Sequence, residues 1–266
     1  MGNILPILAL FGFRLTFGVA LAMGITPSKL VTSGFYRIHL WVLMGVNTLA
    51  VLAVHTARDS YDHIDWRVIF GLAISLVVAS YAGSVMWLYE KSRHGARLLY
   101  FVALAALIAA ALATFAARPP METTGWIATL IFLDLISSGL LLGVTLSAMF
   151  LGHWYLNTPT MNLVPLKRLV LLMVSAIAVR TIVSAVGLSL HMSSTEEELS
   201  IAWWMFIGLR WVSGLLGTLM LALLTWRTLK VPNTQSATGI LYAGVILAFI
   251  GELTSMLLSV DTLYPV

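Results

Sequence analysis

Eight apolar runs, each about as long as a membrane-spanning helix, are the feature that most limits how this chain can fold. They cover residues 4–24, 38–56, 68–89, 98–117, 127–152, 167–190, 202–226 and 239–259. About 20 apolar helical residues cross a bilayer core, where no water is present to satisfy an open backbone. The alternating pattern of transmembrane β-barrel strands is absent from the sequence. We therefore predict an all-α, polytopic transmembrane helical bundle of about eight spans, forming a single integral membrane domain over residues 1–266.

The composition supports this fold class and excludes several kinds of chemistry. Hydrophobic residues make up 60% of the chain and charged residues 10%, whereas soluble domains average about 25% charged residues. The sequence has no cysteine, which excludes disulfides, iron–sulfur clusters and thiolate metal sites. Nucleotide-binding and hydrolase motifs are also absent, and the net charge of +4 is scattered over loops. We expect no catalysis by this chain alone and no nucleic-acid partner.

The basic residues predict how the chain is oriented. The loops after the first, third, fifth and seventh runs carry nine of them: Lys29, Arg37, Lys91, Arg93, Arg97, Lys167, Arg168, Arg227 and Lys230. The loops on the opposite side carry only Arg58, Arg67 and Arg118. Because loops rich in lysine and arginine stay in the cytoplasm, we expect the N- and C-termini on the extracytoplasmic side of the inner cell membrane.

The acidic residues gather on the predicted extracytoplasmic side. They are Asp59, Asp62, Asp65, Glu122, Glu196, Glu197, Glu198 and Asp261, whereas Glu90 alone lies on the other side. One interpretation is a solvated rim. The other is a docking surface for a basic extracytoplasmic partner, such as a c-type cytochrome, because opposite charges steer association.

Short matches between the two halves predict a parallel repeat of four spans each. Gly18-Val19-Ala20-Leu21 in the first span resembles Gly143-Val144-Thr145-Leu146 in the fifth, and Leu99-Tyr100 resembles Leu241-Tyr242 in the eighth. The first and fifth spans cross in the same direction, so the repeat would be parallel rather than inverted. We expect half-repeats over residues 1–120 and 121–266.

Five charged residues lie at membrane depth, away from the ends of the apolar runs, and are the main candidates for a buried site. They are Arg14, Asp134, Arg180, Arg210 and Glu252. A charge at this depth is costly unless it is paired or hydrated, so it marks a functional site by default. One interpretation is a set of ion pairs that locks the helices together. The other is a polar chamber for an anionic or quinone-like ligand, haem propionates or a proton path, favoured by the one arginine left over after pairing.

Four histidines lie near the ends of spans and are candidate haem ligands. His39 and His153 fall on the predicted cytoplasmic side, and His55 and His191 on the opposite side. A b-type haem takes two imidazoles from different helices at one depth, which either pair could supply. His39 and His55 are 16 residues apart on one span and so point to nearly opposite faces, which favours one haem over two.

The extracytoplasmic loops offer a second use for histidine. His55 with Asp59, or His63 beside Asp62 and Asp65, could bind zinc or copper. A solvated loop is the alternative interpretation of the same residues.

Taken together, these patterns lead to three functional hypotheses. The first is a membrane subunit of an electron-transfer complex, of the respiratory or photosynthetic type, that handles quinone or a b-type haem and contacts other membrane subunits. The second is a transporter of a small anion or organic acid that uses Arg14, Arg180 and Arg210. The third is a structural membrane subunit without a cofactor.

Overall fold

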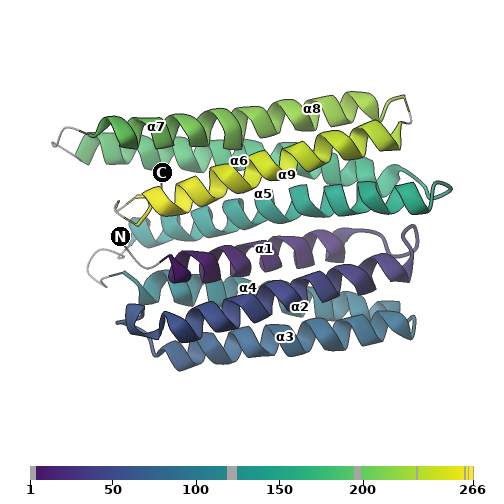
Figure 1. Cartoon of the computed structure of the whole chain (residues 1–266), viewed down its shortest axis with the longest axis horizontal. Coiled ribbons are helices and arrows are strands. Elements are labelled where there is room, and N and C mark those ends of the chain that lie inside the picture. The colour runs from purple at the N-terminus through teal and green to yellow at the C-terminus, as the bar shows by residue number, and fades with distance from the viewer. Residues whose placement is uncertain are drawn as a thin grey trace. The chain divides into compact units, whose positions relative to one another are not determined.

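The computed structural model describes residues 4–118, 125–194, 199–231, 233–260, 262, 264 and 265, and this part of the chain is helical and contains no strand (Figure 1). The elements are α1 (Leu5–Ile25), α2 (Ser33–Thr56), η1 (Arg58–Ser60), α3 (Trp66–Leu88), α4 (Ser92–Ala116), α5 (Trp126–Asn157), α6 (Val164–Ser194), α7 (Ile201–Leu209), η3 (Arg210–Gly217), α8 (Thr218–Thr228) and α9 (Thr234–Leu258). Because α7, η3 and α8 follow one another without a break, the described residues form eight helices long and apolar enough to cross a membrane. The predicted all-helical, multi-pass fold is confirmed.

Several helices extend beyond the apolar runs that predicted them. Helix α2 begins at Ser33 and α4 at Ser92, whereas the corresponding apolar runs begin near residues 38 and 98. Helix α5 continues to Asn157, past the end of its apolar run. Polar residues can extend a helix into the interface because water there satisfies the backbone ends. His39 and His153 therefore lie within helices rather than at their first or last residue.

The chain divides into two compact units. The first comprises Met1–Thr123 and Thr160–Pro165, and the second comprises Thr124–Pro159 and Leu166–Val266. In the first unit, α2 packs against α1 and α3, and α4 packs against the same two helices, which closes a four-helix bundle. In the second unit, α9 packs against α5, α7, η3 and α8. A repeat relationship between the two halves stays a prediction.

The distribution of polar and apolar side chains is that of a bundle surrounded by lipid. Large apolar side chains such as Leu52, Val78 and Leu104 are mostly exposed on the outside of the first unit. Meanwhile, Ser80 and Asn47 are completely buried. This pattern is the reverse of a water-soluble bundle, where large exposed apolar patches are rare. A lipid membrane is thus the environment in which these helices are stable.

Candidate functional site

A completely buried arginine joins three helices of the second unit. Arg180 on α6 donates from Nε to Glu252 Oε1 at 2.8 Å and from Nη2 to Oε2 at 3.0 Å. Its Nη1 donates to Asp134 on α5 and forms an ion pair with that carboxylate. Two oxygens of one carboxylate facing one guanidinium form the strong, orientation-specific version of this pair. Arg180 therefore ties α6 to α9 and α5 at once.

Hydroxyl groups one turn away from the carboxylates complete the shell around Arg180. Ser255, which follows Glu252 on α9, accepts from Arg180 Nη2 at 3.1 Å, and Ser137 on α5 accepts from Nη1 at 3.5 Å. A spacing of three residues puts each serine on the same helix face as its acid. Each of the three guanidinium nitrogens thus has a protein acceptor, which is what a buried arginine needs to remain charged without water.

Arg210 joins this group from η3 and balances its charge. Its Nη2 donates to Ser184 of α6, and its charge acts directly on the Glu252 carboxylate. We call Asp134, Arg180, Arg210 and Glu252 the charge cluster. Two arginines face two acids here, so the cluster is formally neutral. The fifth predicted residue, Arg14, is buried on α1 in the first unit and is not part of the charge cluster.

A π-helix positions Arg210. The eight residues of η3, Arg210–Gly217, form the wider π-type turns, and the Thr218 hydroxyl donates to the Ser213 carbonyl five residues back at 3.3 Å. Such turns are uncommon and often occur at functional sites because they change which side chains face a neighbour. Here η3 presents Gly214 to Gly251 of α9 so closely that a Cβ built on Gly214 would lie 2.6 Å from the Gly251 Cα.

The two histidines of the predicted cytoplasmic-side haem pair have comparable hydrogen bonds. His39 is buried, and its Nδ1 lies 2.6 Å from the Phe35 carbonyl oxygen. Because a carbonyl only accepts, Nδ1 carries the proton and the lone pair of neutral His39 is on Nε2. His153 is exposed, and its Nδ1 lies 3.1 Å from the Tyr242 hydroxyl. The two side chains belong to different units.

The two histidines of the other predicted haem pair lie near aromatic rings. His55 lies 5.8 Å from both Trp66 and Phe70, measured between ring centroids, and the His191 ring lies 5.5 Å from Trp203. Among the residues that the structure describes, no three histidine or acidic side chains are grouped to hold a metal ion. The haem pairs need only two ligands, so they stay predictions.

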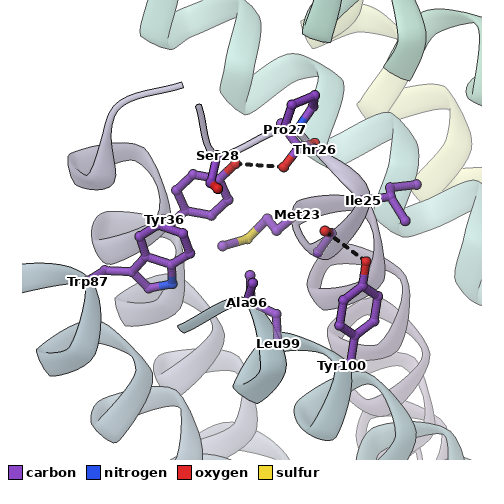
Figure 2. A pocket seen from close by; sticks show the side chains of 11 residues that line it. Met23, Ile25, Thr26, Pro27, Ser28, Tyr36, Trp87, Ala96, Leu99 and Tyr100 are labelled. Atoms are coloured by element: carbon purple, nitrogen blue, oxygen red, sulfur yellow. Dashed lines mark hydrogen bonds between the residues drawn. The ribbon is translucent and has the colours of Figure 1, made fainter. Parts of the chain in front are cut away.

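An aromatic pocket in the first unit is a site that the sequence did not predict. It has a volume of about 430 Å³ and lies where α1 and α3 end and α2 and α4 begin (Figure 2). The Tyr36 and Trp87 rings are stacked on one wall, 4.0 Å apart and 10° from parallel. Tyr100 forms the opposite wall, and the Met23 side chain lies between the two walls (Figure 2). We call this space the aromatic pocket.

Hydrogen bonds to the backbone at the end of α1 position two tyrosine side chains of the aromatic pocket. The Tyr36 hydroxyl donates to the Thr26 carbonyl at 2.9 Å, and the Tyr100 hydroxyl donates to the Gly24 carbonyl at 2.9 Å. The Trp87 ring packs on Gly95, where a Cβ would lie 2.7 Å from Trp87 Nε1. That Nε1 is buried and has no hydrogen-bond acceptor among the described residues. A buried donor of this kind can be satisfied by a ligand.

Comparison with known proteins adds no assignment to these sites. No protein-family model, no curated protein and no solved structure matches this chain. The charge cluster, the histidines and the aromatic pocket are therefore the features that indicate a function. The signal for the aromatic pocket was present in the sequence as Tyr36, Trp87 and Tyr100, but aromatic residues at span ends are common as interface anchors.

Proposed function

We propose that this protein is a subunit of an electron-transfer complex, respiratory or photosynthetic in type, in the inner cell membrane, and that its aromatic pocket binds a quinone headgroup. The pocket itself is the observation that carries the proposal. Its volume falls within the range of small-ligand sites, about 300–1,000 Å³, and its walls are flat aromatic rings that suit a planar ring. Its position at the ends of the helices would leave the apolar tail of the quinone in lipid.

The polar groups around the aromatic pocket suit the two oxygens of a quinone. Trp87 Nε1 is a donor with no acceptor among the described residues, and the Ser28 side chain lines the same space. Both can donate to a quinone oxygen. A hydrogen bond to a buried donor gains more than one to a donor that water already satisfies.

A b-type haem on His39 and His153 is the second part of the proposal. An imidazole that ligates a metal usually has its other nitrogen fixed by a hydrogen bond. The Nδ1 atoms of both residues have such partners, the Phe35 carbonyl and the Tyr242 hydroxyl. The basic loops are proposed to be cytoplasmic and both termini extracytoplasmic, because loops rich in lysine and arginine stay in the cytoplasm.

The parallel repeat has support from two matching helices. Helices α4 and α9 each have 25 residues, and Leu99-Tyr100 and Leu241-Tyr242 are the eighth and ninth of them. Each leucine is buried. Each tyrosine hydroxyl contacts the first helix of its own unit, at Gly24 in α1 or at His153 in α5. We infer that the two halves descend from one four-helix unit.

The docking of a basic partner, such as a c-type cytochrome, is proposed from the acidic loops. Asp59 is exposed and pairs with the adjacent Arg58 at 3.6 Å, and Asp65 accepts from the Arg67 backbone at the start of α3. Asp62 is exposed as well, and the remaining acidic residues of this predicted rim lie outside the described residues: Glu122, Glu196, Glu197, Glu198 and Asp261. Contacts with further membrane subunits belong to the same proposal.

Anion transport has weaker support than electron transfer. The nitrogens of Arg180 already have acidic and hydroxyl acceptors, and no part of that side chain is exposed. An anion would have to displace a carboxylate. The charge cluster thus has the properties of a structural lock, which is compatible with a role in an electron-transfer subunit.

Filling the aromatic pocket should weaken quinone binding. We expect Ala96→Phe to raise the Kd of a short-tailed quinone about tenfold or more, because the added ring would occupy the ligand volume. The measurement is a titration of tryptophan fluorescence in the purified protein. Leu104→Phe is the matched control, since Leu104 lies on the same helix and is 58% exposed on its outer face. Equal affinity in both variants and the unmodified protein would refute the pocket assignment.

Haem binding gives a separate prediction. Protein purified from a haem-supplying host should show a Soret band and a reduced-minus-oxidised difference spectrum of b type. We expect His39→Ala and His153→Ala each to lose the band, whereas a His94→Ala variant, which changes an exposed histidine in the first turn of α4, should keep it. Protein without a Soret band would remove haem from the proposal and leave the quinone test unaffected.

A further inference from the structure

A second hollow in the first unit lies on the outside of the bundle, between α2 and α3. It has a volume of about 360 Å³, and its lining includes Arg37, Trp41, Tyr81 and Val85. We propose that this groove binds an anionic phospholipid, with the phosphate on Arg37 and an acyl chain along the aromatic and aliphatic wall. This site is distinct from the aromatic pocket, with which it shares no lining residue.

The depth of each lining residue matches the parts of a phospholipid. Arg37 lies near the start of α2, which begins at Ser33, and Val85 lies near the end of α3, which ends at Leu88. Helix ends lie at the level of lipid headgroups, where the phosphate is. Trp41 is one turn deeper on α2 and forms an edge-to-face pair with Tyr81, with ring centroids 5.9 Å apart. Both rings are about half exposed and so are accessible to an acyl chain.

The charge at this end of the unit favours an anionic headgroup. The Arg37 side chain is half-buried and makes no ion pair or hydrogen bond to any residue that the structure describes. Further cations at the same helix ends are exposed: Lys29, Lys91, Arg93 and Arg97. Glu90 is the one acidic residue in the α1–α2 and α3–α4 connections. Basic groups at a membrane surface attract anionic lipid, each by about 1 kcal/mol.

A lipid fits this groove better than a soluble ligand does. The remaining lining side chains include Ile38 and Leu88, which are about half exposed. A free phosphate would gain nothing from this apolar wall, whereas an acyl chain would cover it. A zwitterionic lipid would cover the wall but would interact less with Arg37, since its own ammonium group offsets the phosphate. The groove therefore predicts selection by headgroup charge.

Native mass spectrometry of the whole purified protein, incubated with equal amounts of phosphatidylglycerol and phosphatidylcholine, tests this proposal. We expect more bound phosphatidylglycerol than phosphatidylcholine in the unmodified protein. Arg37→Gln should lower bound phosphatidylglycerol about fivefold, and Arg37→Lys should retain most of it. Arg97→Gln is the matched control, because it removes one cation at the same end but outside the groove, and it should change binding less than twofold.

Three outcomes would overturn the lipid site. The first is equal binding of the two lipids by the unmodified protein. The second is an equal loss in Arg37→Gln and Arg97→Gln, which would indicate diffuse charge attraction and no groove. Trp41→Leu provides a second variant that leaves every charge in place. It should shorten the residence of phosphatidylglycerol, and unchanged residence would also contradict the assigned groove.

Discussion

Replacing Arg180 with methionine should destabilise the second unit by about 3–5 kcal/mol, the usual range when one partner of a buried ion pair is removed. The guanidinium is completely buried and is bound by Glu252 through two oxygens and by Asp134 through one. Methionine fills much of the same volume, so the loss would come mainly from two carboxylates left without their cation. The measurement is reversible unfolding in mixed micelles, followed by tryptophan fluorescence.

A matched control and a double variant separate pairing from general damage. Arg58 pairs with Asp59 at the surface, where the two side chains are 53% and 92% exposed. Arg58→Met should therefore change stability by less than about 0.5 kcal/mol. Arg180→Met combined with Glu252→Met removes one charge of each sign. This double variant should be about 1–3 kcal/mol more stable than the sum of the single losses. Strictly additive losses would show that Arg180 and Glu252 do not stabilise the fold by pairing with each other.

The number and location of the spans could be predicted because lipid imposes a length and a composition on each helix. The ends were less predictable, since α2 begins at Ser33 in a polar segment that hydropathy alone assigns to a loop. The five buried charges were also identifiable, because charge is so scarce in this chain. Their pairing was not, since Arg180 is 46 residues from Asp134 and 72 from Glu252.

The aromatic pocket and η3 are two features that the hydrophobic pattern of the sequence does not predict. Tyr36, Trp87 and Tyr100 come from three helices, and only packing reveals that they surround one space. A π-helix differs from an α-helix by a small change in residues per turn and has no composition of its own. Nor does the sequence indicate that Gly214 of η3 lies against Gly251 of α9.

The contact between η3 and α9 leads to the second large effect. We expect Gly251→Ala to destabilise the protein by up to about 3 kcal/mol, as overpacking does in a tightly packed interior. A Cβ on Gly251 would overlap the Gly214 backbone, and one on Gly214 would lie 2.6 Å from the Gly251 Cα. Because a backbone atom cannot rotate away as a side chain can, the helices must separate. Small residues at such a crossing let membrane helices approach.

Alanine at two other glycines provides the comparison for this effect. Gly239 lies on α9 and Gly208 on α7, and a Cβ built on either meets no atom within 4 Å. Alanine favours helix over glycine by about 1 kcal/mol, so Gly239→Ala and Gly208→Ala should leave stability unchanged or raise it. A loss of stability in Gly251→Ala would therefore indicate a close helix crossing, whereas a gain would indicate only the higher helix propensity of alanine. If Gly251→Ala stabilised the protein as the controls do, η3 and α9 could not approach as closely as described. Since Glu252 follows Gly251 directly, a Gly251→Ala variant that folds should also weaken the coupling between Arg180 and Glu252 in the double-variant measurement.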